Sequence, residues 1–178
     1  LTQTIMSAFG SRIMLPQSGI LMNNGMMWFD PRPGGPNSVR GSRKPLCNMC
    51  PVIVKKAANN ASANSVFAVG ACGGRKIFPS VFQLISFMVD NQLDIDDAVH
   101  RPRIDNSGSE VITIMDSMPQ GVVDQLTNRF PQSRLRPNGV SPNHFALPQL
   151  VENVSNSTNT GGCFVPSPHA KVSCADDF

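Results

Sequence analysis

The sequence has little charge and no long apolar run. Charged residues make up 15% of its 178 positions, the net charge is +3, and no basic run is longer than Arg43-Lys44. Proteins that bind nucleic acid cluster Lys and Arg on one face or in one segment, so this distribution argues against a nucleic-acid partner. A membrane-spanning helix needs about 18 or more consecutive apolar residues, and we therefore expect no transmembrane segment in this chain.

Cysteine is scarce and irregularly spaced. The five cysteines are an odd number at uneven intervals, which does not fit the paired pattern of a disulfide framework. Cys47 and Cys50 form a CxxC motif, but no second pair and no nearby His accompany it. We therefore expect neither a metal site nor a redox site there, and no cofactor. The chain opens at Leu1 without a signal peptide, so we expect a processed product or a fragment.

Proline and glycine are plentiful, at 15 and 14 residues, and 40% of the chain is hydrophobic. This composition is typical of a loop-rich globular protein, and we expect residues 1–178 to form a single domain. Strands occur in hairpins and helices come as a group between them, which indicates an α+β or layered αββα fold. Strands are predicted over residues 1–6, 51–54, 65–69, 110–115, 145–151 and 163–165, and helices over residues 75–91, 94–100 and 120–129.

The most informative stretch is a strand that runs through glycines into a helix. Residues 66–69 are apolar and β-branched, Gly70, Gly73 and Gly74 follow, and a helical apolar pattern begins at residue 75. Glycines permit backbone angles closed to other residues and let the main chain approach a ligand. The unpaired N–H groups at such a helix start suit an anion or a developing oxyanion. An ordinary tight turn between strand and helix is the alternative.

A second feature is the apolar cluster formed by Met26, Met27, Trp28 and Phe29, next to the turn sequence Asn23-Asn24-Gly25. These side chains either pack in the core or form the wall of an apolar pocket. The sequence alone leaves both interpretations open.

Several short motifs follow one another along the chain in a characteristic order. They are Thr2-Gln3-Thr4-Ile5, Phe9-Gly10-Ser11, Ser18-Gly19-Ile20-Leu21-Met22-Asn23-Asn24, Pro36-Asn37, Lys44-Pro45-Leu46, Met49-Cys50-Pro51, Gly70-Ala71-Cys72-Gly73-Gly74, Ala98-Val99 and Pro102-Arg103. This ordered set resembles the small, C-terminal subunit of gamma-glutamyltranspeptidases, most densely over residues 1–104.

The resemblance implies an N-terminal-nucleophile hydrolase with a four-layer αββα sandwich, completed by a large subunit from the same precursor. In this family the precursor cuts itself, and the new N-terminal Thr becomes the nucleophile, with its own α-amine as general base. The acyl group passes to Thr and then to water or an acceptor amine. Members are usually secreted, periplasmic or tethered outside the cell, so we expect an extracellular or periplasmic location.

Position by position, Gly73 and Gly74 resemble the family's oxyanion-hole pair, in agreement with the reading of the glycines above. Thr4 resembles the Thr that hydrogen-bonds near the nucleophile. The two consecutive Ser residues that hold the substrate α-carboxylate fall on Cys47 and Asn48. Asn48 keeps a hydrogen-bond donor, whereas a Cys thiol is a weak one.

The sequence departs from the family in three places. The nucleophilic Thr is expected before Leu1. The acidic residue that pairs with the substrate α-ammonium falls on Trp28, and an Asn at the same end of the substrate falls on Met6. Trp28 offers a cation–π face, worth about 0.5–2 kcal/mol, and Asp30 is a nearby acid that could face elsewhere.

Three functions remain open. The family default is cleavage of gamma-glutamyl compounds such as glutathione. An apolar pocket formed by Met6, Met26, Met27 and Trp28 would instead favour an amidase or acylase for less polar acyl chains, similar to the related cephalosporin acylases. The third is a non-catalytic relative that keeps the fold as a structural or binding protein. An N-terminal Thr in the mature protein separates the two enzymes from the third.

Overall fold

The computed structural model describes residues 5–6, 10–56, 65–107, 110–139, 144–154 and 160–163. The chain divides into two compact units. We call Gln3–Met49 the N-terminal unit, and we call Leu1–Thr2 together with Cys50–Phe178 the sheet unit. Each is described by itself. None of the helices in the described ranges has the length and apolar character that crossing a membrane requires.

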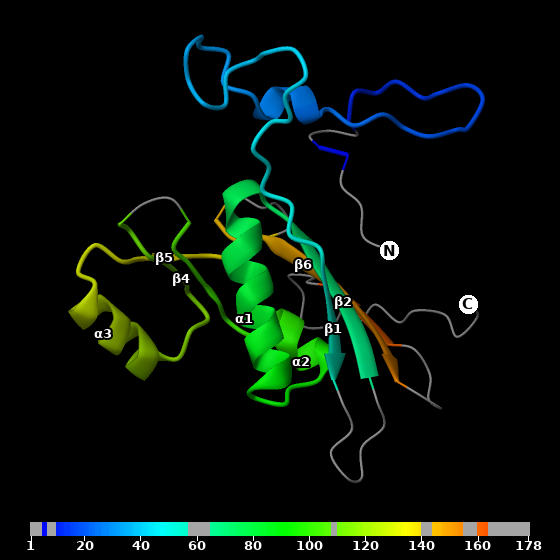
Figure 1. Cartoon of the computed structure of the whole chain (residues 1–178). Coiled ribbons are helices and arrows are strands. Elements are labelled where there is room, and N and C mark those ends of the chain that lie inside the picture. Colours follow the sequence, from blue (N-terminus) through cyan, green and yellow to red (C-terminus); the bar gives the residue numbers. More distant parts are fainter. Residues whose placement is uncertain are drawn as a thin grey trace. The chain divides into compact units, whose positions relative to one another are not determined.

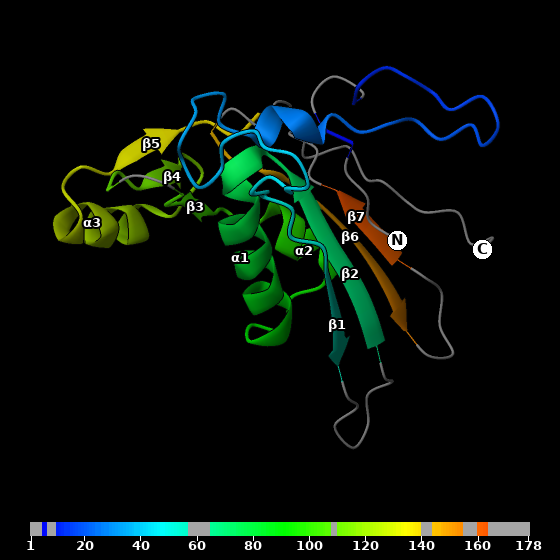
Figure 2. The ribbon, with the colours of Figure 1, turned by 45° about the horizontal axis from the view of Figure 1, so that its top comes forward.

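The sheet unit is built on a four-stranded antiparallel sheet. Its strand order is β1 (Val52–Lys56), β2 (Ser65–Cys72), β6 (Leu147–Val154) and β7 (Thr160–Cys163). β1 pairs antiparallel with β2, and β2 pairs along its whole length with β6. The helices α1 (Ile77–Val89) and α2 (Ile95–His100) are inserted between β2 and β6 and cover one face of this sheet (Figures 1 and 2).

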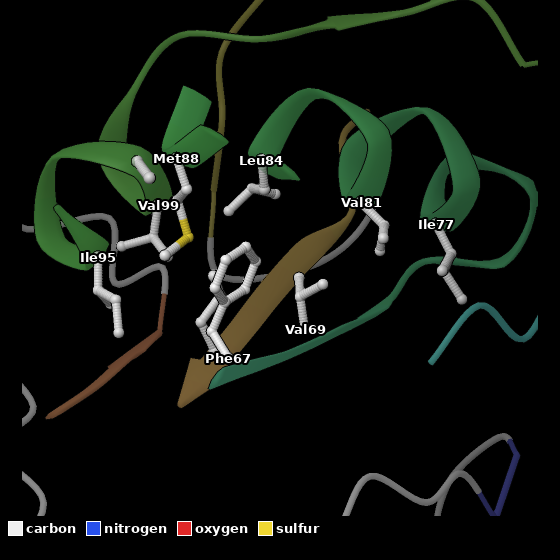
Figure 3. Close-up of a cluster of buried hydrophobic side chains, with 10 residues drawn as sticks. Phe67, Val69, Ile77, Val81, Leu84, Met88, Ile95 and Val99 are labelled. Atoms are coloured by element: carbon white, nitrogen blue, oxygen red, sulfur yellow. The ribbon is translucent and has the colours of Figure 1, made fainter. Parts of the chain in front are cut away.

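The core lies between this sheet and its two helices (Figure 3). Successive strand side chains point to opposite faces, so Phe67 and Val69 of β2 both point towards the helices. They meet Val81 and Leu84 of α1 and Val99 of α2, all of which are fully buried. Burying each such side chain stabilises the fold by about 1.5–3 kcal/mol. This packing fixes the end of β2 relative to the start of α1.

The opposite face of the sheet is apolar but exposed. Ile53 and Val151 both lie opposite Ala68 in the register, which places the three side chains on one face. Ile53 is 69% exposed and Val151 is 43% exposed, and Val66 on the same face of β2 is 38% exposed.

A smaller sheet follows α2, with the order β3 (Ile104–Asp105), β4 (Thr113–Met115) and β5 (Arg134–Arg136). The parallel strands β4 and β5 are joined through the helix α3 (Gln120–Arg129). Gln83 of α1 ties this sheet to the core, because its side chain donates to the carbonyl oxygen of Ile104 and accepts from the Ile104 N–H.

The N-terminal unit contains a hairpin-like segment followed by a short helix. Ser11 N–H donates to the carbonyl oxygen of Met22 at 3.0 Å, and Leu15 N–H donates to that of Ile20 at 3.0 Å. The 3₁₀ helix η1 (Gly25–Trp28) follows. Gly10 precedes the hairpin with φ +64, where any Cβ would collide with the Met22 carbonyl oxygen, so only glycine fits there.

The predicted α+β class is confirmed, and so are most of the elements. The helix predicted at 120–129 has the same bounds as α3, and those at 75–91 and 94–100 correspond to η2 (Gly74–Lys76) with α1, and to α2. The strand predicted at 110–115 is shorter, and β3 and β5 were missed, because segments of two or three residues carry no periodic signal. The end of the strand predicted at 163–165 lies outside the described residues, and Cys163 ends β7.

The strand predicted at residues 1–6 is wrong at its end. Ile5 and Met6 belong to no strand, and Met6 has φ 65, a left-handed conformation that a strand does not contain. The first four residues, including Thr4, lie outside the described residues.

Candidate active site

The two candidate oxyanion glycines lie where β2 passes into α1. β2 ends at Cys72, Gly73 has φ 144 and Gly74 has φ 60, and η2 leads directly into α1. A φ of 144 is open only to glycine, and a φ of 60 strains other residues. A Cβ on Gly74 would meet nothing within 4 Å. A side chain at Gly74 would therefore strain the backbone without colliding with any residue that the structure describes.

The prediction for Gly70 is corrected by the structure. Gly70 is buried inside β2 and pairs with Gln149, so it belongs to the strand and contributes nothing to the turn. The change of direction is made by Gly73 and Gly74 alone, because β-pairing continues through Cys72.

Some main-chain N–H groups at this turn are hydrogen-bonded and others are not. Lys76 N–H donates to the Gly73 carbonyl oxygen at 3.3 Å, and Ile77 N–H donates to the Gly74 carbonyl oxygen. The N–H groups of Gly74 and Arg75, at the start of the helix, donate to no main-chain acceptor within the described ranges. Gly73 is half-buried and Gly74 is exposed. Such unpaired N–H groups at a helix start are suited to an anion or to the oxygen of a tetrahedral intermediate.

The four residues of the apolar cluster in the N-terminal unit differ in their exposure to solvent. Phe29 is buried at 9% exposure, whereas Met26 and Met27 are 64% and 56% exposed. Trp28 is half-buried, and its ring lies over Gly25, where an added Cβ would be 3.5 Å from Trp28 Cζ3. The core interpretation therefore fits Phe29, whereas Trp28 is only partly buried.

Asp30 is held by Arg32. Its Oδ1 accepts from Arg32 Nε at 3.0 Å, and its Oδ2 accepts from Arg32 Nη2 at 3.0 Å. This side-chain pairing, with a further hydrogen bond from the Arg32 N–H, lowers the pKa of Asp30. Asp30 is therefore ionised at neutral pH, but its charge is already matched, which argues against it as the acid that Trp28 replaces.

Asn37 joins separate parts of the N-terminal unit. Its Nδ2 donates to the carbonyl oxygen of Trp28 at 2.7 Å, and its Oδ1 accepts from Leu46 N–H at 2.9 Å. Leu46 immediately precedes Cys47. The motif Pro36-Asn37 was visible in the sequence, but the partners of an amide side chain in an irregular loop were not.

The remaining predicted residues are placed individually. The Cys47 thiol is free and exposed, and Asn48 is half-buried. The Met6 carbonyl oxygen accepts from Gly10 N–H at 2.7 Å. The N-terminal unit contains Met6, Trp28, Asp30, Cys47 and Asn48, and the sheet unit contains the two glycines.

Across the described part of the chain, no three His, Cys, Asp or Glu side chains lie close enough together to form a metal site.

Comparison with known proteins places this geometry in a family. The family model described as gamma-glutamyltranspeptidase matches residues 1–153. The chain is 33% identical over 128 residues to the acylase ACY 1 proenzyme of Pseudomonas sp. (strain SE83), covering 72% of this chain and 22% of that protein. It is 34% identical over 125 residues to the glutathione hydrolase proenzyme of Bacillus subtilis (strain 168), covering 70% of this chain and 20% of that protein. The chain thus spans about a fifth of the length of these relatives.

A solved structure agrees with the sequence comparisons. A mutant gamma-glutamyltranspeptidase of Helicobacter pylori is similar with a TM-score of 0.68 and 27% identity, over 94% of this chain and 92% of that chain. The fold that the resemblance implied is therefore confirmed, and the chain belongs to the gamma-glutamyltranspeptidase family.

Proposed function

We propose that the full-length protein containing this chain is an amide hydrolase and acyltransferase, and that this chain is its small, catalytic subunit. The observation that carries the proposal is the turn at Gly73 and Gly74, with its unpaired N–H groups, in a chain of this family. The names of two relatives, a glutathione hydrolase and an acylase, support amide cleavage as the reaction class.

In the proposed mechanism, an N-terminal Thr expected before Leu1 attacks the substrate carbonyl carbon, and its α-amine takes the hydroxyl proton. Negative charge develops on the carbonyl oxygen. The main-chain N–H groups of the turn stabilise it: the resemblance assigns this role to Gly73 and Gly74, and the Gly74 N–H is one of the two unpaired donors described above. Thr4 donates or accepts a hydrogen bond near the nucleophile. Collapse of the intermediate breaks the substrate C–N bond, the N-terminal ammonium returns its proton to the departing amine, and a Thr ester remains. Water or an acceptor amine then cleaves this ester.

The acyl chain is proposed to bind with its far carboxylate at Cys47 and Asn48. Trp28 and Met6 stand where the family keeps an acid and an Asn, and Asp30 is paired with Arg32. A substrate ammonium would therefore lose water without gaining an anionic partner. Gamma-glutamyl compounds, including glutathione, remain the default substrates. The Trp28 environment favours a second candidate, an acylase for acyl chains without the α-amine.

A large subunit from the same precursor is the proposed partner. The relatives are described as proenzymes, and the exposed sheet face of Ile53, Val66 and Val151 is apolar surface that a second layer would bury. Phe78 and Phe82, one turn apart on α1, are also 65% and 63% exposed.

An extracellular or periplasmic location is proposed from the family alone.

The proposed function is tested by incubating the full-length protein with gamma-glutamyl and glutaryl p-nitroanilides, with and without glycylglycine as acceptor. Release of nitroaniline, faster with the acceptor and accompanied by acylated glycylglycine, is the expected result. If neither anilide is cleaved and the precursor stays unprocessed, the protein is a non-catalytic relative and the proposal fails.

A further inference from the structure

Asn37 connects the two segments that carry the proposed substrate contacts. Its hydrogen bonds to the Trp28 carbonyl oxygen, at 2.7 Å, and from Leu46 N–H, at 2.9 Å, have ordinary geometry. Its own carbonyl oxygen also accepts from Asp30 N–H at 2.9 Å. One half-buried side chain thus holds the main chain at residue 28 beside the main chain that immediately precedes Cys47.

The chemistry of the amide group matters for this connection. A main-chain carbonyl needs a donor, and a main-chain N–H needs an acceptor, and Asn supplies one of each on a short side chain. Asp keeps the acceptor and loses the donor, and Ala loses both. The two connections can therefore be removed separately.

We propose that Asn37 is a positioning residue that fixes the separation between Trp28 and the Cys47-Asn48 pair. It acts through Leu46 and touches no substrate itself. A binding group that is held less firmly in position contributes less to holding the part of the substrate that it contacts. Loss of Asn37 therefore weakens the hold on the carboxylate end of the acyl chain and leaves the reacting end unchanged. This inference rests on the proposed function.

Ser38 provides a matched control in the same loop. Its buried hydroxyl donates to the Arg32 carbonyl oxygen and accepts from Gly35 N–H at 2.8 Å. These contacts stabilise the loop but reach neither Trp28 nor Leu46. Ser38→Ala therefore reports what loosening the loop alone does.

The experiment measures kcat and KM of the full-length protein for three p-nitroanilides: gamma-glutamyl, glutaryl and butyryl. The first two acyl chains keep the far carboxylate, and butyryl lacks it. Losing the hydrogen bonds of Asn37 should raise KM for the glutaryl compound about tenfold in Asn37→Ala, with kcat within about twofold. Cleavage of the butyryl compound should stay within about twofold of the wild type, and Ser38→Ala should leave the ratios among the three substrates unchanged.

Asn37→Asp keeps the acceptor for Leu46, so KM for the glutaryl compound should stay near the wild-type value while the ratio of gamma-glutamyl to glutaryl cleavage shifts. Equal losses on all three substrates, or a Ser38→Ala variant that behaves like Asn37→Ala, would overturn the inference. If the wild type is active and Asn37→Ala has the same kcat and KM, this inference fails but the proposed function stands. A wild type that cleaves none of the three defeats the proposed function and this inference with it.

Discussion

Replacing Gly74 by Val tests whether the turn at Gly73 and Gly74 contributes to catalysis beyond its effect on stability. Gly74 has φ 60, and a left-handed conformation disfavours L-residues by about 1–2 kcal/mol. Since a Cβ there would meet no described residue within 4 Å, backbone strain is the structural penalty expected. If the strain turns the peptide N–H away from the developing oxyanion, kcat should fall by about 10²–10³-fold.

Gly19 provides the matched control. It has φ +66, a Cβ there would also meet nothing within 4 Å, and it lies in the hairpin-like segment of the N-terminal unit. Gly19→Val should reduce the free energy of unfolding by a similar amount, about 1–2 kcal/mol, with kcat unchanged. Both variants are followed by urea unfolding and by steady-state cleavage of the preferred anilide. Equal kcat values for correctly processed Gly74→Val and Gly19→Val would refute the oxyanion role of this turn.

Three further substitutions test other parts of the account. Trp28→Asp should raise the ratio of kcat/KM for gamma-glutamyl over glutaryl anilide by about tenfold or more, because it restores an anion opposite the ammonium; an unchanged ratio would place Trp28 away from the substrate. Asp30→Asn should leave that ratio within about twofold of the wild type, because Arg32 already pairs with the carboxylate, and a large fall would show that Asp30 serves as the missing acid. Arg103→Ala should lower the free energy of unfolding by about 2–4 kcal/mol, since Arg103 is 1% exposed and donates to the Val99 and Ala146 carbonyl oxygens; urea unfolding with no shift would contradict this.

The sequence predicts the long elements well because their patterns are strong. α1 and α3 carry apolar residues at helical spacing, and Asp94 caps α2 by accepting from Asp97 N–H at 2.8 Å. The strand-to-helix turn was also predictable, since consecutive glycines after an apolar run indicate positive φ. Gly70 was misjudged because a glycine that ends a strand and one inside it look alike in sequence.

The contacts of the candidate site were less predictable. The Asp30–Arg32 pair and the two bonds of Asn37 depend on where loop residues fall in space, and neither hydrophobic periodicity nor turn propensity encodes this. Residue spacing placed Trp28 near other candidate residues, but only the structure shows that its ring covers Gly25 and that its carbonyl oxygen is held by Asn37.

The central claim is that this chain works as the acyl-accepting subunit of an N-terminal-nucleophile enzyme. The most direct test is mass spectrometry of the processed full-length protein, acid-quenched during turnover of its preferred anilide, with peptide mapping of the acylated residue. The account predicts one acyl group, in ester linkage, on a Thr at the N-terminus of the chain that contains Gly73 and Gly74. Acylation of any other residue, or turnover with no N-terminal Thr in the mature protein, would contradict it.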